Sequence, residues 1–510
     1  MKTLSIDLKD YEESESSGFD LCIIGSGPAG ISLASKFIDT NINVAILESG
    51  ITSLSQRHDK LNEAHSIGKR EIDPIESRSR RYGGAMHLWA GTSAPFSEVE
   101  LLDRKKMGIS GWPITWEELV PFYKQAATLL DVRWNLFFQP YQELKTQMSD
   151  AFPNLAGTIL RSNNYFQAKN KDLTVSLDNK LSKASNIKII TNSTVVDFEL
   201  EQGILTHAVA KTISGKRVHL KAKCFVLCNG ALEATRLLLT SGLFKNNVPH
   251  HLGKNFMSHP SFTDVASIHL KRNKRKWVNK TKLHTKVDFE LNFEEQNIQK
   301  VLRHNIHMAP SYVKSQNLVL ASSRINKDLN QGVTNLFKSN SLLVRLWDIF
   351  CRVFGKRAWS NTWNVSIGIE QEPLKDRSLS LSDQKDELGV NMLRLDGGEI
   401  SELEKKTISA ALSGLDKALR EKNVGELTLS DDYLSGAYLS RQDPINHHIG
   451  TIKMGSSSTE GVVDNNLKVF NYDNLYVCSS AVFPTSSNAN PTFTIVALSL
   501  RLGNLLKTVL

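Results

Sequence analysis

The stretch LCIIGSGPAGISLASKF, residues 21–37, decides the fold of this chain. Its first four residues form an apolar run that predicts a buried strand, and ISLASKF has the apolar spacing of a helix. Between them Gly25, Gly27 and Gly30 form a G-x-G-x-x-G motif. A second apolar run, NVAILE at 43–48, predicts the next strand, so the stretch begins a strand–turn–helix–strand unit of a parallel sheet.

This glycine motif indicates a dinucleotide site. Missing side chains permit a tight turn and let a diphosphate approach the free amides at a helix N-terminus. Glu48 ends the second strand, where its carboxylate can accept the hydroxyl groups of an adenosine ribose. An acidic side chain there disfavours a 2'-phosphate, so NADP is the least suitable ligand. The motif leaves NAD, FAD and a simple close-packed turn as alternatives.

Length and composition favour an ordinary globular enzyme. A chain of 510 residues predicts two or three interlocked domains, and 40% hydrophobic with 23% charged residues is typical of a soluble protein. The N-terminus lacks the pattern of a secretory signal, and no stretch has the roughly 18 consecutive apolar residues of a membrane-spanning helix. Five cysteines, most of them in apolar runs, predict buried free thiols. We therefore expect a cytoplasmic protein.

The formal net charge of +9 suits either an anionic partner or a lysine-rich surface. The densest basic run, KRNKRK at 271–276, lacks the interleaved aromatic residues of a nucleic-acid platform, which favours a solvated loop and no nucleic-acid partner. Cys224 and Cys228 lack a second ligand pair, so no metal site is predicted.

The rest of the chain divides into regions of different periodicity. Residues 187–227 predict several strands, and NGALEATRLLL after them predicts a helix. From about 260 to 445 the alternation of apolar and polar residues is less regular, and a helix is predicted near 401–422. The last 65 residues predict a strand followed by a helix. RRYGGAMHLWAG at 80–91 predicts a loop whose backbone lies against a flat ligand.

Seven sequence blocks in order resemble the glucose-methanol-choline (GMC) family of flavoproteins, from one end of the chain to the other. The last block, with ANPT before a helix, is most similar to the sugar-oxidising branch that contains pyranose 2-oxidase and bacterial glycoside oxidases. The blocks are GSGPAG with ILESG, RYGGAMHLWAG, GWPITWEELVPFY, CNGALEATRLLL, LGKNFMSHP, NHHIGTIKMG and NLYVCSSAVFPTSSNANPT.

The resemblance implies an α/β fold, α+β overall, with FAD extended across a Rossmann-like domain. That domain would comprise residues 1–110, 186–260 and 445–510, interleaved with a mainly antiparallel-sheet substrate domain at 111–185 and 261–444. The residues that the family pattern places against FAD are Gly25, Ser26, Gly27, Pro28, Ala29, Gly30, Glu48, Gly84, His87, Leu88, Trp89, Ala90, Gly91, Val195, Ser480, Asn490 and Thr492.

The resemblance also implies a catalytic pair. In the family's H-x-x-G-T block, the histidine three positions before Gly450 is His447, with His448 as the alternative one register away. Asn490 stands where other members carry a second histidine. A histidine with a pKa near neutrality can take the hydroxyl proton while a hydride leaves the carbon, and Asn490 can hold the same oxygen. We expect oxidation of an alcohol, specifically a secondary hydroxyl of a sugar or glycoside.

Several alternatives stay open. The family includes hydroxynitrile lyases with a structural flavin, and a non-catalytic flavin-binding protein is a further alternative. Ser479 stands where many members have an acidic residue, and His259 in MSHP is either a structural histidine or a residue near the flavin. The electron acceptor, whether oxygen, a quinone or a redox protein, is not specified.

One position in the sequence indicates whether FAD is attached covalently. Relatives that bind FAD covalently use a histidine four residues after the second glycine of the GG pair, and counting from Gly84 that position is Leu88. In an extended loop the neighbouring His87 would point to the opposite face. We therefore expect non-covalent FAD.

The segment LLVRLWDIFCRVF at 342–354 is apolar with one narrow charged stripe. As a helix it would be about 20 Å long, too short to span a bilayer. It predicts a buried or substrate-covering helix, and the alternative is a weak membrane-surface contact that reaches a quinone.

Overall fold

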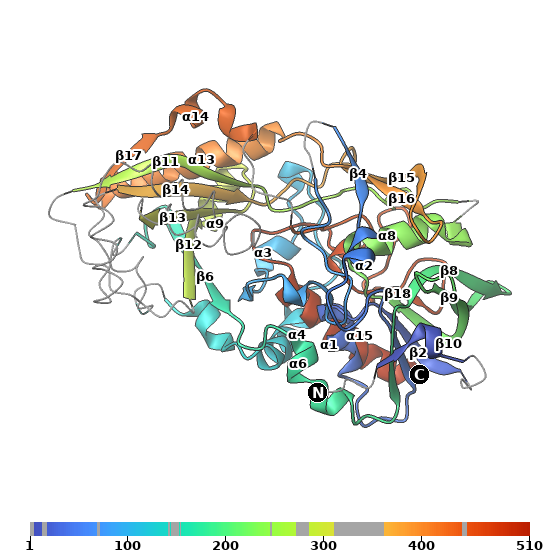
Figure 1. Ribbon diagram of the computed structural model, residues 1–510. Coiled ribbons are helices and arrows are strands. Elements are labelled where there is room, and N and C mark those ends of the chain that lie inside the picture. The colour runs from blue at the N-terminus through green and yellow to red at the C-terminus, as the bar shows by residue number, and fades with distance from the viewer. Residues whose placement is uncertain are drawn as a thin grey trace, which may run out of the picture.

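The computed structural model describes residues 5–12, 18–68, 72–140, 143, 152, 155–244, 247–271, 285–310, 362–440 and 446–510. The segment 342–354, with its membrane-surface hypothesis, lies outside these residues, as does the basic run 271–276 beyond Lys271. Within the described residues, a sheet built around parallel strands and an antiparallel sheet lie at opposite ends of the molecule (Figure 1).

The first sheet contains the strand–turn–helix–strand unit expected from the glycine motif. Its order is β1-β7-β3-β2-β10-β9-β8, with β18 paired to β10. The strands are β1 (Ser5–Asp7), β2 (Phe19–Ile24), β3 (Val44–Leu47), β7 (Ile187–Thr191), β8 (Thr194–Glu201), β9 (Ile204–Lys211), β10 (Arg217–Leu227) and β18 (Leu475–Val477). β2 and β3 pair in parallel, as the crossover through α1 (Pro28–Ala34) requires. The predicted unit is confirmed.

Strand β10 joins two kinds of pairing. Its first half, residues 217–221, pairs antiparallel with β9, and its second half, 222–227, pairs in parallel with β2. On the other side of this second half lies β18, also in parallel. The parallel core therefore takes its strands from the beginning, the middle and the end of the chain.

The second sheet is antiparallel in all its recorded pairs. Its order is β17-β11-β14-β13-β12-β6-β5. The strands are β5 (Thr92–Ser93), β6 (Leu160–Gln167), β11 (Ser261–Leu270), β12 (Thr285–Leu291), β13 (His304–Pro310), β14 (Thr362–Ile369) and β17 (Gly425–Leu429). Burial alternates strictly along β14, where Val365 and Ile367 are buried and Asn364 and Ser366 are half-buried. One face is thus apolar and the other polar.

Helix α13 (Glu402–Glu421) packs against β6, β12, β13 and β14 and lies over this sheet in Figure 1. Its predicted position near 401–422 is confirmed, and a capping box between Ser401 and Glu404 begins it. The other helices are α2 (Gln56–Lys60), α3 (Glu98–Leu101), α4 (Trp116–Leu129), α6 (Leu173–Ser176), α7 (Asp178–Leu181), α8 (Gly230–Thr240), α9 (Phe293–Gln299), α14 (Asp431–Leu434) and α15 (Thr492–Val509).

The C-terminal helix α15 packs against both α1 and α4. A small sheet of β15 (Ser378–Lys385), β16 (Asn391–Asp396) and β4 (Ala64–Ile67) combines strands from the two predicted domains. The fold is the mixed α/β class expected from the sequence, with a Rossmann-like sheet and a sheet-rich second region. The exact-residue division into domains stays a prediction.

Candidate active site

A cavity of about 1160 Å³ opens where the carboxyl ends of β2 and β3 approach the N-terminus of α8. Its walls come from segments as far apart in the chain as residues 24–29 and 490–495. Of the predicted site residues, Gly30 and Gly91 are not among those that line it. Those that do are Gly25, Ser26, Gly27, Pro28, Ala29, Glu48, Gly84, His87, Leu88, Trp89, Ala90, Val195, His447, Ser480, Asn490 and Thr492.

The three motif glycines meet different surroundings. Gly25 has a φ of 103°, and a Cβ there would lie 2.8 Å from the carbonyl oxygen of Cys228. A Cβ on Gly30 would lie 1.9 Å from the carbonyl oxygen of Gly25, so this glycine packs the helix onto the turn. A Cβ on Gly27 would meet nothing within 4 Å. The middle glycine therefore borders open space, which suits the approach of a ligand.

Glu48 lies in the floor of this cavity and is buried. Its Oε2 atom accepts hydrogen bonds from the backbone amide (3.0 Å) and Oγ (2.6 Å) of Ser26, and Oε1 accepts one from the amide of Gly50 (2.9 Å). Burial raises the pKa of Glu48, against the lowering effect of these hydrogen bonds. The carboxylate thus fixes the glycine turn to the end of β3.

Unpartnered polar atoms along the cavity test whether a dinucleotide fits. Among the described residues, buried side-chain atoms without a hydrogen-bond partner include four that belong to cavity-lining side chains. A buried polar group without a partner is costly, so these atoms suit the polar groups of a bound cofactor. They are Asn62 Nδ2, Ser79 Oγ, Ser193 Oγ and Asn229 Oδ1.

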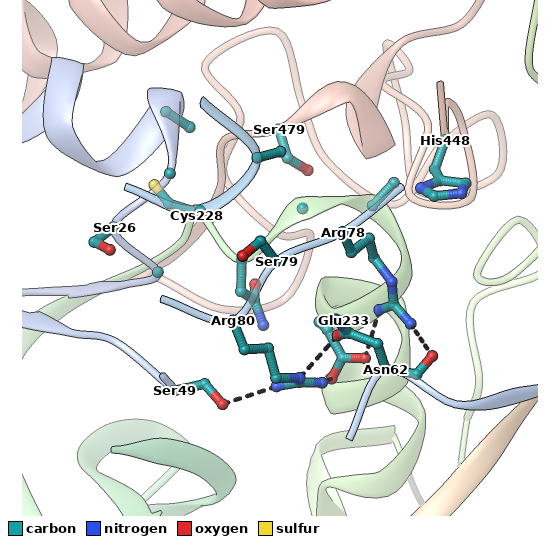
Figure 2. A pocket seen from close by; sticks show the side chains of 18 of the residues that line it. Ser26, Ser49, Asn62, Arg78, Ser79, Arg80, Cys228, Glu233, His448 and Ser479 are labelled. Atoms are coloured by element: carbon teal, nitrogen blue, oxygen red, sulfur yellow. Dashed lines mark hydrogen bonds and ion pairs between the residues drawn. The ribbon is translucent and has the colours of Figure 1, made fainter. Parts of the chain in front are cut away.

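A charged cluster that the sequence analysis missed forms another wall (Figure 2). Glu233 on α8 pairs with Arg78 and Arg80 at 2.8 Å each and with Arg236 at 3.6 Å. Arg236 also pairs with Asp386 at 2.5 Å. Burial would raise the pKa of Glu233, but the three guanidinium groups outweigh it and hold that pKa well below its usual range.

Within the cluster three guanidinium groups face two carboxylates, so the arginines lie among acidic partners. Glu48 and Glu76 also line the cavity, so its Arg, Asp and Glu side chains carry no excess of positive charge. Arg80 also donates to Oγ of Ser49 at 2.9 Å, next to Glu48 (Figure 2). No local motif marks this cluster, because its residues come from separate segments of the chain. The residues present therefore fit FAD in the volume of the cavity, in the open space at Gly27 and in polar atoms.

The loop at 80–91 is not extended where the sequence analysis expected it to be. Residues Gly84–His87 form a turn of 3-10 helix, because Gly83 and Gly84 turn the backbone with φ values of 98° and 53°. His87 and Leu88 consequently both line the cavity. Both ring nitrogens of His87 face acceptors, with Nε2 2.8 Å from the carbonyl oxygen of Tyr82 and Nδ1 3.2 Å from the carboxylate of Asp172.

His447 is half-buried at the cavity and contacts a second histidine. Its Nδ1 atom lies 2.9 Å from Nδ1 of His259, and the two rings meet edge to face. Burial, followed by the influence of His259 and His448, lowers the pKa of His447 well below its usual range. The imidazole is therefore neutral near pH 7, the state that a proton acceptor requires.

His448, the alternative base, has different surroundings. Its Nε2 atom lies 3.4 Å from Oγ of Ser77, and its ring stacks on Phe256. Burial and the nearby Arg78 lower the pKa of His448 to about 3. Both histidines line the cavity, so lining alone does not choose between them.

The predicted C-terminal residues line the same cavity as these histidines. Asn490 donates from Nδ2 to the carbonyl oxygen of Thr92 at 3.0 Å, which leaves its Oδ1 atom and one N–H for a ligand. Ser480 donates to the carbonyl oxygen of His448 at 2.6 Å, so its hydroxyl holds the histidine segment. Ser479, at the position that is acidic in many family members, caps the 3-10 helix Ser480–Val482.

Other groups in the described part of the chain give no further site. Cys22, Cys224, Cys228 and Cys478 are free and buried, and Cys351 lies outside that part. Neither a metal-ligand cluster nor a helix long and apolar enough to cross a membrane occurs among the described residues.

Comparison with known proteins places the chain in a family. Two family models described as GMC oxidoreductase match residues 79–261 and 393–499, together more than half of the chain. The 2-methyl-1,2-propanediol dehydrogenase of Mycolicibacterium austroafricanum is 21% identical, over 95% of this chain and 94% of its own length.

Two solved structures share the fold at 16% identity. Pyridoxine 4-oxidase from Mesorbium loti has a TM-score of 0.60 and covers 96% of this chain and 99% of its own. Formate oxidase from Aspergillus oryzae has a TM-score of 0.57, with coverage of 97% and 99%. The chain belongs to the GMC oxidoreductase family and is an FAD-dependent oxidoreductase that acts on alcohol-type donors.

Proposed function

We propose that this protein oxidises a secondary hydroxyl of a sugar or glycoside, with His447 as the base and Asn490 as the residue that holds the reacting oxygen. The observation that carries this proposal is that both side chains line the same cavity as the glycine turn and Glu48. Bound FAD supplies the two-electron acceptor for the hydride.

His447 takes the hydroxyl proton while the carbon loses its hydride, and a carbonyl product remains. The low pKa of His447 leaves the imidazole unprotonated at neutral pH, as a proton acceptor must be. It also departs from the near-neutral pKa expected from the sequence, because burial and two neighbouring histidines disfavour the charged ring, and it makes the imidazole a weaker base. Asn490 is oriented by its bond to Thr92, and its free N–H can donate to the oxygen as negative charge develops there.

Hydrogen bonds on the antiparallel sheet lead toward Asn490, although the side chains that make them are not among the residues that line the cavity. Tyr165 donates to Oδ1 of Asn305 at 2.9 Å, and Nδ2 of Asn305 donates to the carbonyl oxygen of Asn488 at 2.8 Å. This chain of bonds ends two residues before Asn490. These bonds therefore hold the segment that precedes Asn490 in place.

We also propose that FAD is bound without a covalent bond and that the reduced flavin passes its electrons to an external acceptor. The contacts of His87 support a cofactor without a covalent bond, since each ring nitrogen lies within 3.2 Å of an oxygen atom of the protein. Oxygen, a quinone and a redox protein stay open as acceptors.

Contact of 342–354 with a membrane surface is tested by co-sedimentation with anionic vesicles at low salt, where absence of binding rejects it.

The decisive experiment is an anaerobic screen for flavin bleaching. The holoenzyme is mixed with free sugars, glycosides and simple alcohols, with 2-methyl-1,2-propanediol, pyridoxine and formate as comparison substrates. Bleaching by a sugar or glycoside supports the proposal, and bleaching by the comparison substrates alone rejects the sugar class. A lyase would instead convert a cyanohydrin with its flavin still oxidised, and a binding protein would do neither.

A further inference from the structure

The two histidines at the cavity are placed opposite each other by a short antiparallel pairing. Met257 and Ile449 exchange backbone hydrogen bonds of 2.9 and 3.0 Å. His259 lies two residues after Met257, and His447 lies two residues before Ile449. Since the side-chain period of an extended strand is two, these side chains fall on the same face as cross-strand neighbours. In a register shifted by one residue, His448 instead of His447 would lie opposite His259.

The hydrogen bonds of His259 determine which of its nitrogens carries a proton. Nε2 of His259 lies 2.8 Å from the carbonyl oxygen of Ser486, which can only accept, so Nε2 carries the proton. Burial lowers the pKa of His259, which keeps the ring neutral near pH 7. In a neutral ring with a protonated Nε2, Nδ1 is an acceptor.

The same logic then applies to His447. Its Nδ1 atom lies 2.9 Å from the acceptor Nδ1 of His259, so His447 donates this hydrogen bond and carries its proton on Nδ1. Its Nε2 atom has no hydrogen-bond partner among the described residues, and the side chain lines the cavity. The lone pair of Nε2 is thus available to a ligand.

We propose that His259 is a positioning residue that holds His447 in the Nδ1–H tautomer, so that Nε2 of His447 is the atom that accepts the substrate proton. This inference rests on the proposed role of His447 as the base. It assigns a task to the carbonyl of Ser486 as well, since that oxygen fixes the tautomer of His259.

Three substitutions at position 259 separate these roles. His259→Asn can place its Oδ1 atom near the former Nδ1 atom and so keep an acceptor for His447. His259→Gln reaches Ser486 with its amide but leaves no acceptor at the Nδ1 position, and His259→Leu removes both bonds. Each is measured as holoenzyme for bound FAD, thermal stability and the rate constant of anaerobic flavin reduction at saturating substrate.

We expect the rate constant of flavin reduction in His259→Asn to stay within about fivefold of wild type. His259→Gln and His259→Leu should lower that rate constant by roughly 100-fold. All three variants should keep FAD bound and change substrate affinity little. Reduction by His259→Gln within a factor of about three of wild type would overturn the proposal, as would equal losses in His259→Asn and His259→Gln. His447→Ala serves as the reference: if it reduces its flavin at the normal rate, the proposed base is wrong, whatever the variants at 259 do.

A measurement on the unchanged protein keeps the inference testable if a variant does not fold. Nitrogen-15 NMR of histidine-labelled holoenzyme reports the tautomer of each ring, and the signals of His447 are those lost in His447→Ala. A protonated Nδ1 with an unprotonated Nε2 is expected. The opposite tautomer would overturn the proposal.

Discussion

The hydroxyl of Ser26 donates a 2.6 Å hydrogen bond to the buried carboxylate of Glu48, and this bond connects the glycine turn to the end of the next strand. The carboxylate of Glu48 accepts hydrogen bonds from three donors, two on Ser26 and one on Gly50. In Glu48→Gln one carboxylate oxygen becomes an NH2 group, which cannot accept, so at least one of these donors loses its partner. We expect a stability loss of about 1–3 kcal/mol and weaker FAD binding. Thermal unfolding and FAD titration measure both, with the exposed Glu63→Gln as the matched control.

Glu233 should control stability at neutral and mildly acidic pH. Its pKa is held well below the usual 4.5 by three arginines, so its stabilising effect is full above the pKa of the unfolded chain and is lost as pH falls toward the lower folded value. Glu233→Gln leaves three buried guanidinium groups without this partner, at a cost of about 3–5 kcal/mol at pH 7. Urea unfolding at a series of pH values should show the deficit shrinking below about pH 4.

The control for this experiment is Glu387→Gln, which removes an exposed ion pair with Arg57. Surface pairs contribute little, so no measurable change in unfolding is expected. Equal losses of unfolding free energy in Glu233→Gln and Glu387→Gln would show that the buried cluster stabilises the protein no more than an exposed ion pair does.

His447→Ala should slow anaerobic flavin reduction by roughly 100-fold to 10,000-fold while the protein stays yellow, because general-base catalysis contributes a factor of that size. The exposed His250→Ala is the control and should behave as wild type. If the His447 variant reduces its flavin within a factor of about three of wild type, the base is misassigned and His448 is the next residue to replace.

Acid precipitation tests how FAD is held. Both nitrogens of His87 are engaged and Leu88 has no nucleophile, so free FAD should appear in the supernatant after precipitation of the yellow protein. Colour that stays with the pellet would mean that a side chain is bonded to the flavin, and its loss in His87→Ala would identify that side chain.

The sequence was sufficient where the signal is local. The apolar run before Gly25 and the spacing after it predicted β2 and α1, because strand and helix periods are visible within ten residues. The same holds for α13, whereas the C-terminal residues at the cavity were implied by the family resemblance and not by a local period. The 3-10 turn at Gly84–His87 escaped prediction, since two successive positive φ values at glycines left no periodic pattern.

Contacts between distant segments could not be predicted in this way. Arg78 and Glu233 are 155 residues apart, and His259 and His447 are 188 residues apart. Which of two adjacent histidines meets His259 depends on the pairing of Met257 with Ile449, and that register is set by tertiary packing.

The pairing of β10 with both β2 and β18 also constrains the order of events during synthesis. The glycine turn leaves the ribosome about two hundred residues before its neighbouring strand β10, and β18 follows β10 by about another two hundred and fifty residues. A nascent chain therefore displays the turn without one or both of these neighbouring strands until β18 has been synthesised. Flavin capture must be a late event, and a chain halted before residue 475 should be released colourless.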